Sequence, residues 1–149
     1  MDQIDRKILK VLQANARASL QEVGQAVGLS SSPCWERIRK LEAAGVIEGY
    51  TVRLNAQALG FTDTVMVQVT LDSHSDNTLE KFGETLAAIP EVIEAYLVSG
   101  EYDYLLRVAV KDTRDYERLL RERLYKIKGI RHSKSSFVLR TLKKADLPL

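Results

Sequence analysis

The sequence predicts an α+β fold in two domains, because the spacing of its apolar residues changes along the chain. Up to about residue 45, apolar residues recur at every third or fourth position, which is the periodicity of helices. From Phe61 onward, several stretches alternate apolar and polar residues, which is the periodicity of strands. Gly60 interrupts the pattern between these regions. We therefore place the domain boundary there, with domains spanning residues 1–60 and 61–149.

Composition limits the class of protein. The chain has 149 residues, 45% of them hydrophobic, and a net charge of +2, which suffices for packed cores and is mildly basic. Cys34 has no second cysteine for a disulfide, and with only His74 and His132 beside it the usual ligand set of a structural zinc is missing. No stretch resembles a signal peptide or a membrane span. We expect a soluble, cytoplasmic protein without a metal or cofactor.

Caps and apolar spacing predict two helices near the N-terminus. Asp2 is a candidate N-cap for a helix that runs to about Asn15. Ser19 and Glu22 form a capping box that begins a second helix, and Gly28 is its predicted C-cap. The apolar stripes of the two helices are formed by Ile4, Ile8, Leu9 and Leu12, and by Leu20, Val23, Gly24 and Val27.

A third helix is predicted within "SSSPCWERIRKLEAAGVI", residues 30–47. Ser32 is the expected N-cap, Pro33 suits the first helical position, and Gly45 closes the helix. At 100° per residue, Trp35 lies away from the apolar side and is expected to be exposed. The side that faces the core is formed by Cys34, Ile38 and Leu41, so Cys34 is expected to pack as a small hydrophobe.

Two short helices joined by a glycine turn, with a preceding helix to complete the core, are typical of a helix-turn-helix. The later helix of this motif enters the DNA major groove, and its N-terminus favours phosphate. The candidate DNA-binding residues are Ser31, Ser32, Pro33, Trp35, Glu36, Arg37, Arg39 and Lys40. The alternative interpretation is that the three cations form a solvated face that Glu36 and Glu42 balance through pairs one helical turn apart.

After the third helix, "VIEGYTVRLN" alternates Tyr50, Val52 and Leu54 with Thr51 and Arg53. Such alternation predicts a short strand that serves as a wing or a linker.

The second domain is predicted to contain the element order βαββαβ. A strand spans residues 65–71, a helix runs from about Asp76 to Ile89, and "VIEAYLVSG" and "YDYLLRVAV" form two strands joined at residues 100–103. Asp112 caps a further helix that Gly129 ends, and "SSFVLRTLK" forms the last strand. This order is typical of the ferredoxin-like fold, in which both helices cover one face of an antiparallel sheet.

Apolar and aromatic residues occur on both sides of several of these strands. Because the helices can cover only one sheet face, we expect another subunit to cover the other, so that the protein is at least a dimer.

The whole chain resembles the Lrp/AsnC family, also called feast/famine regulators. The resemblance lies in "IDRKIL" (residues 4–9), in "VGLSSSPCWERIRKLEAAGVI" (residues 27–47), and in the "SGEYDY" turn. It implies a winged helix-turn-helix of three helices, a linker strand and a C-terminal ferredoxin-like domain that binds an effector. The helix "SPCWERIRKLE" and hairpin "GEYDYLLRV" further resemble the branch that includes cysteine-responsive activators.

The resemblance also implies homodimers that assemble into tetramers or octamers, with an amino acid or related small metabolite bound between dimers. By position, the effector-binding residues would be Gly100, Glu101, Tyr102, Asp103, Ser133 and Ser135. Amides of a glycine turn can bind a carboxylate, and Asp103 can accept from an ammonium group. The alternative is an ordinary hairpin turn.

These observations favour a sequence-specific regulator of transcription that binds double-stranded DNA and responds to an amino acid, and that is not an enzyme. The chain contains no phosphate-binding glycine loop and no metal-ligand cluster, and its histidines have no evident nucleophile partner. Two alternatives stay open: an architectural, nucleoid-type DNA-binding protein, and an amino-acid sensor that acts alone.

Overall fold

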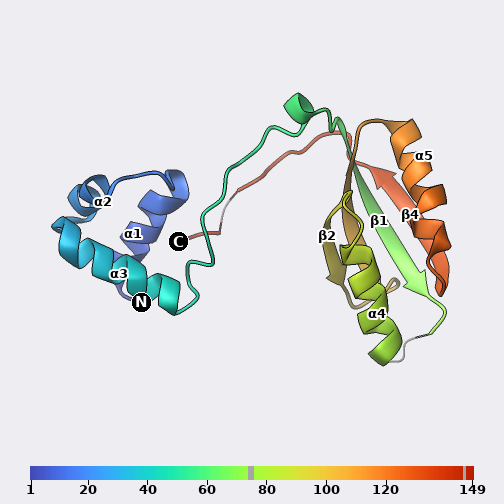
Figure 1. Cartoon of the computed structure of the whole chain (residues 1–149), viewed down its shortest axis with the longest axis horizontal. Coiled ribbons are helices and arrows are strands. Elements are labelled where there is room, and N and C mark those ends of the chain that lie inside the picture. The colour runs from blue at the N-terminus through green and yellow to red at the C-terminus, as the bar shows by residue number, and fades with distance from the viewer. Residues whose placement is uncertain (74–75, 146) are drawn as a thin grey trace. The chain divides into compact units, whose positions relative to one another are not determined.

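The computed structural model describes residues 1–73, 76–145 and 147–149, so His74 lies outside the described residues (Figure 1). The fold is α+β, as predicted. Contacts divide the chain into one unit of residues 1–54 with 143–149 and a second unit of residues 55–142. Between the helices and the first strand, hydrogen bonds from the Leu59 N–H to the Asn55 carbonyl and from the Phe61 N–H to the Ala56 carbonyl give the chain local structure.

The first unit contains the three predicted helices, α1 (Gln3–Ala14), α2 (Leu20–Val27) and α3 (Ser31–Ala43). Both predicted N-caps are confirmed. Asp2 caps α1 in a capping box with Asp5, and Ser19 caps α2 in a capping box with Glu22. Gly28 ends α2 with φ of +75°, a conformation that favours glycine. The shared core contains Ile8, Val23, Cys34, Ile38 and Leu41.

The start of α3 differs from the prediction. Its N-cap is Ser30 rather than Ser32, no side chain caps it, and Pro33 occupies the third helical position instead of the first. The turn before α3 passes close to α2. A Cβ added at Gly24 would lie only 2.5 Å from the carbonyl oxygen of Leu29, so this position leaves no room for a side chain. Proline is tolerated throughout a first helical turn, where backbone N–H groups have no partner within the helix.

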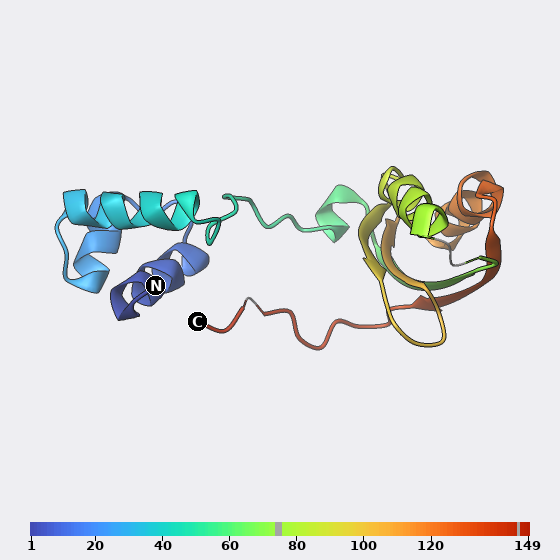
Figure 2. The ribbon, with the colours of Figure 1, turned by 90° about the horizontal axis from the view of Figure 1, so that it is seen from below.

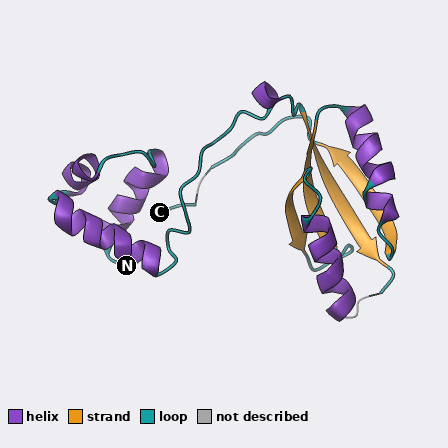
Figure 3. Ribbon diagram, viewed as in Figure 1, coloured by secondary structure: helices purple, strands orange, loops and turns teal. Residues whose placement is uncertain are grey.

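The strand predicted over residues 50–54 is wrong. Figure 3 draws the segment after α3 as loop, and no strand is assigned there. Val52 and Leu54 are 73% and 70% exposed. Alternation produces a strand only where a partner strand supplies hydrogen bonds, and none pairs with this segment among the described residues. A short 3₁₀ helix, η1 (Gln57–Leu59), follows and ends at Gly60 with φ of +85°.

The second unit has the predicted ferredoxin-like order. Its elements are β1 (Asp63–Leu71), α4 (Asp76–Ala87), β2 (Val92–Leu97), β3 (Tyr104–Val110), α5 (Thr113–Glu122), η2 (Leu124–Lys126) and β4 (Ile130–Phe137). The strands pair in the order β2-β3-β1-β4, and every pair is antiparallel. Figure 2 shows α4 and α5 on the same side of this sheet. Within the described part of this unit, no helix covers the other face of the sheet, which we call the open face.

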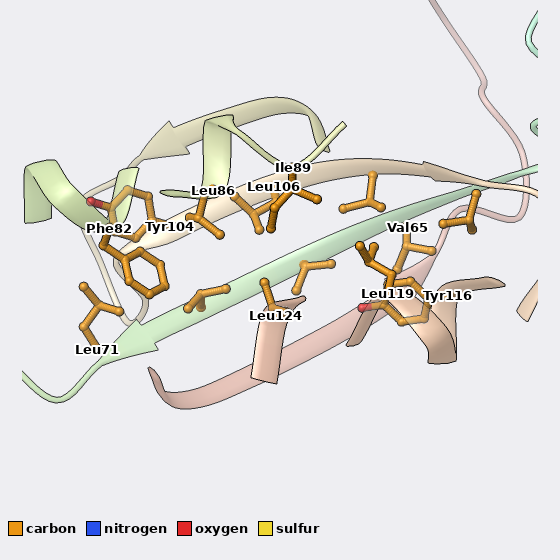
Figure 4. Close-up of a cluster of buried hydrophobic side chains, with 14 residues drawn as sticks. Val65, Leu71, Phe82, Leu86, Ile89, Tyr104, Leu106, Tyr116, Leu119 and Leu124 are labelled. Atoms are coloured by element: carbon orange, nitrogen blue, oxygen red, sulfur yellow. The ribbon is translucent and has the colours of Figure 1, made fainter. Parts of the chain in front are cut away.

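Successive side chains of β1 alternate between the face that the helices cover and the open face. Val65, Val67, Val69 and Leu71 are buried under the helices, as predicted. Figure 4 shows the side chains of this core, to which both helices and β3 contribute. The open face contains the intervening residues and their cross-strand partners, among them Met66, Gln68, Leu105 and Arg107.

Two C-terminal boundaries differ from prediction. Helix α5 ends at Glu122, and η2 continues the chain and buries Leu124, so Gly129 ends the connection instead of the helix. The last strand begins at Ile130 and ends at Phe137, earlier than predicted, because its register is set by pairing with β1. Beyond Val138, which donates to the Thr64 carbonyl near the start of β1, the chain leaves the sheet. No helix in the described part of the chain is long and apolar enough to cross a membrane.

Candidate nucleic-acid interface and effector site

The outer face of α3 carries most of the predicted DNA-binding residues. Trp35 is 46% exposed although it neighbours the buried Cys34, which confirms the division that the helical periodicity predicts. The Arg39 guanidinium carbon lies 5.0 Å from the Trp35 ring centroid, within the range of a cation–π contact. The residues of this group that are exposed are Ser31, Ser32, Pro33, Trp35, Glu36, Arg39 and Lys40.

Arg37 differs from these residues because it is half-buried and paired with α1. Its Nη1 lies 2.7 Å from Oδ2 of Asp2 and 2.8 Å from Oδ1 of Asp5. Hydrogen bonds to Asp2 and Asp5 raise the pKa of Arg37. The backbone N–H of Asp5, and then the Arg37 guanidinium, lower the pKa of Asp2. Arg37 therefore joins the recognition helix to the capping box of α1.

The alternative interpretation, in which Glu36 and Glu42 neutralise the α3 cations, is wrong. Among the described residues, neither glutamate forms an ion pair with an α3 cation. Glu42 instead accepts a hydrogen bond of 2.9 Å from the Tyr50 hydroxyl. Arg39 and Lys40 are therefore not neutralised within the helix, which leaves their charge available to an anionic partner.

The predicted effector turn joins β2 to β3. Gly100 has φ of +132°, and a Cβ there would meet no atom within 4 Å. The Asp103 N–H donates to the Val69 carbonyl, and the Asp103 Oδ2 accepts from the Leu71 N–H at 2.7 Å. One oxygen of this carboxylate thus holds the turn against the end of β1. Glu101 is exposed, and Tyr102 is partly buried beside it.

The two predicted serines lie on β4, on the face that the helices cover. Ser133 pairs with Val69 and Ser135 with Val67, so both share the side of the buried valines. Since Val69 also pairs with Tyr104, Ser133 and the effector turn lie at the same end of the sheet, about 10 Å apart across two strand spacings. Ser135 is further along β4, where it shares a hydrogen bond with the Tyr116 hydroxyl of α5.

A groove of about 440 Å³ beside α4 was not predicted. Its lining combines two lysines with polar and apolar side chains from α4 and from the segment before β4, namely Asn77, Lys81, Phe82, Thr85, Ile127 and Lys128. Its lysines are distant in sequence and belong to no recognisable motif. Ile127, which precedes Lys128, packs against the hydrophobic core of the second unit.

A three-helix helix-turn-helix with an exposed cationic face, joined to a separate ferredoxin-like domain, defines a DNA-binding protein with an appended sensory domain. Residues 1–48 match the family model described as winged helix-turn-helix DNA-binding, and residues 64–148 match the Lrp/AsnC ligand binding domain. The chain belongs to the Lrp/AsnC family. This family consists of transcriptional regulators and not enzymes.

Similar proteins agree with this assignment along nearly the whole chain. The leucine-responsive regulatory protein of Escherichia coli is 38% identical over 146 residues, which cover 98% of this chain and 89% of that protein. The structure of an AsnC family transcriptional regulator from Agrobacterium tumefaciens has a TM-score of 0.94 and 39% identity, covering 99% of this chain and 97% of that one. A transcriptional regulator from Neisseria meningitidis, solved as a complex with L-Met, has a TM-score of 0.93 and 32% identity, covering 99% and 96%.

Proposed function

We propose that this regulator binds specific DNA sites through α3 and that an amino acid bound to its C-terminal domain changes the occupancy of those sites. The observation that carries the proposal is the exposed face of α3, where Trp35, Arg39 and Lys40 project from a helix whose other side is buried. The domain assignment that we propose is residues 1–60 for DNA binding and the linker, and residues 61–149 for effector binding and oligomerisation.

For DNA contact we propose the exposed residues of α3, with Ser31, Ser32 and Pro33 near the phosphates at its N-terminus. Glu36 borders the same face. Arg37 has a supporting role in this proposal, because its Nη1 is already shared between Asp2 and Asp5.

For the effector we propose an amino acid that contacts the turn at Gly100, Glu101, Tyr102 and Asp103, with Ser133 and Ser135 on β4, which lies beyond β1. The regulator from Neisseria meningitidis and the feast or famine regulatory protein from Mycobacterium tuberculosis were both solved with L-methionine. These complexes support an amino-acid ligand. The "SPCWERIRKLE" helix and the "GEYDYLLRV" hairpin are the reasons to include cysteine among the candidates.

We further propose that the protein works in the cytoplasm as a homodimer that assembles into a tetramer or octamer. The open sheet face supports the dimer, because it presents partly buried Met66 and Leu105 beside the Arg107–Glu94 ion pair. A second copy of the chain would remove these apolar groups from water.

A thermal-shift screen of the full-length protein against the common amino acids tests the effector. A ligand that binds only the folded state raises the unfolding midpoint. The same ligand should lose its effect in Gly100→Val, because a β-branched side chain is strained at φ of +132° and alters the turn. Gly49→Val is the matched control, since Gly49 has no positive φ and no atom near its Cβ position. If no amino acid shifts the midpoint or alters DNA binding, the effector proposal is wrong.

Footprinting on genomic DNA at constant salt separates the regulator from the two alternatives. A few bounded protected sites support the proposed function. Uniform coating would indicate an architectural protein, because binding through phosphates alone has little sequence preference. No protection at any protein concentration would indicate a sensor that acts without DNA.

A further inference from the structure

Trp35 and Arg39 form a cation–π pair on the exposed face of α3. They are four residues apart, so they lie on adjacent turns of the same side of the helix. The Arg39 guanidinium carbon lies 5.0 Å from the centroid of the Trp35 ring, and both side chains are exposed. The core of the unit does not use this indole, because Cys34, Ile38 and Leu41 supply the buried side of α3. The indole and the cation over it are therefore available to a binding partner of the helix.

The cation–π contact directs the Arg39 cation toward the N-terminal half of α3. Helical side chains lean toward the N-terminus, and the guanidinium lies over a ring attached one turn earlier. In helix-turn-helix proteins, the N-terminal part of the recognition helix contacts the base edges in the major groove. Arg39 therefore extends toward the part of the helix where base contacts form.

The cation–π contact leaves N–H donors of the guanidinium available. The guanidinium has five N–H donors, and a cation–π contact on one side of it does not occupy all of them. Arg39 has no carboxylate partner among the described ion pairs, in contrast to Arg37. A guanidinium held in one plane loses less conformational entropy when it binds a planar, two-acceptor target.

We propose that Trp35 and Arg39 act as one unit that recognises a G·C base pair in the major groove. Arg39 donates two hydrogen bonds to guanine O6 and N7, which is the base edge that accepts two hydrogen bonds side by side. Trp35 is a positioning residue that holds the guanidinium in the plane this contact needs. Lys40 is a compact, strongly hydrated charge outside the cation–π pair and contacts phosphate. The inference rests on the proposed sequence-specific DNA binding and names one determinant of that specificity.

Selection of binding sites from a random double-stranded DNA library tests the inference with the full-length protein. The wild type should select a site with a strongly preferred guanine in each half-site. Arg39→Lys keeps the charge but cannot donate in a fork, so preference at that position should fall by roughly 5- to 150-fold while other positions are unchanged. Trp35→Ala should relax the same position, and Trp35→Phe, which keeps an aromatic face, should restore part of the preference.

Lys40→Ala is the matched comparison on the same helix face. It should weaken binding to all sequences alike and reduce the slope of log affinity against log salt by up to about 0.9, without changing the selected site.

Three results would overturn the inference while leaving the proposed function intact. The first is an unchanged guanine preference in Arg39→Lys. The second is a uniform loss of affinity with a shallower salt slope in Arg39→Ala, which would make Arg39 a phosphate contact. The third is unchanged selection by Trp35→Ala, which would refute the positioning role of the indole. If the wild type selects no preferred site at all, the proposed sequence-specific function itself is wrong.

Discussion

The guanidinium of Arg37 on α3 and the carboxylate of Asp5 on α1 meet across the helix-turn-helix, with Nη1 2.8 Å from Oδ1. The same Nη1 lies 2.7 Å from Asp2, whose carboxylate caps α1. The Asp5 side chain is only 15% exposed. The recognition helix is therefore attached to the first helix through charged groups as well as through the apolar core.

Arg37→Ala should destabilise the first unit and reduce DNA binding without changing sequence preference. The substitution leaves Asp2 and Asp5 side by side without their shared cation, and it loosens the orientation of α3. Urea unfolding followed by circular dichroism should show a lower midpoint. Arg39→Ala is the control and should leave the midpoint unchanged, since Arg39 makes no ion pair among the described residues. A midpoint equal to that of the wild type in Arg37→Ala would contradict the supporting role.

The two capping carboxylates should make the first unit less stable in acid. Backbone N–H donation from Asp5 and the Arg37 guanidinium lower the pKa of Asp2 below its ordinary 3.8. Donation from the Ser19 backbone and hydroxyl lowers the pKa of Glu22 below its ordinary 4.5. A lowered pKa means that the folded state favours the carboxylate. This stabilisation is complete above the unfolded pKa and is lost as pH falls through the folded pKa.

Unfolding midpoints measured from pH 7 down to pH 2.5 check this dependence. Glu22→Gln keeps a capping side chain but removes the charge. Its midpoint should be lower than that of the wild type at pH 7, and the difference should shrink below about pH 4.5 as Glu22 becomes protonated in the wild type. A difference that stays constant over the whole range would show that the charge of Glu22 does not contribute.

Gly24→Ala should destabilise the turn between α2 and α3. The new Cβ would lie 2.5 Å from the Leu29 carbonyl oxygen, so backbone must shift. Overpacking should cost about 1–3 kcal/mol of unfolding free energy. The gain of about 1 kcal/mol in helix propensity offsets part of this cost, so we expect a net loss of up to about 2 kcal/mol. Gly49→Ala is the matched control, because no atom lies within 4 Å of the Cβ position there. Equal unfolding free energies for Gly24→Ala and the wild type would refute the tight turn.

Cys34 should be unreactive while the protein is folded. It is fully buried among Ile8, Val23 and Ile38, and desolvation raises the pKa of its thiol. Both effects keep the nucleophilic thiolate scarce and inaccessible. Iodoacetamide labelling should be at least about tenfold slower in buffer than in denaturant. Comparable rates in the two conditions would place the thiol at the surface.

The substitution Cys34→Ser tests whether the surroundings of Cys34 are apolar, through its effect on the free energy of unfolding. A hydroxyl buried without a partner should lower the unfolding free energy by about 1–3 kcal/mol. Cys34→Ala, which removes the sulfur without adding a polar group, is the comparison. If serine proves as stable as alanine, the pocket around Cys34 is not apolar.

Most elements could be predicted from local sequence because their signals are local. The capping boxes at Asp2 and Ser19 need only residues three positions apart. Cys34 is buried and Trp35 is exposed because successive helical residues are rotated by 100° about the helix axis. The alternation in β1 predicts its buried face because successive side chains point to opposite sides of a sheet.

The errors arose where a distant partner decides the outcome. Residues 50–54 alternate like a strand but pair with no strand among the described residues. The limits of β4 depend on where β1 begins and ends. Periodicity along the sequence carries no information on either point, since hydrogen bonds between strands join residues far apart in the chain.

The sequence by itself determined the two-domain α+β architecture, the helix-turn-helix and which side of α3 is buried, because each depends on periodicity and on caps within a few residues. Only the tertiary structure decided that one of the three cations of α3, Arg37, is paired with another helix. Arg37 meets Asp2 and Asp5 across the unit, Arg39 lies over Trp35, and Lys40 remains exposed. Helical periodicity already places Arg39 beside Trp35 on one helix, whereas only the packing of α3 against α1 brings Arg37 to Asp2 and Asp5.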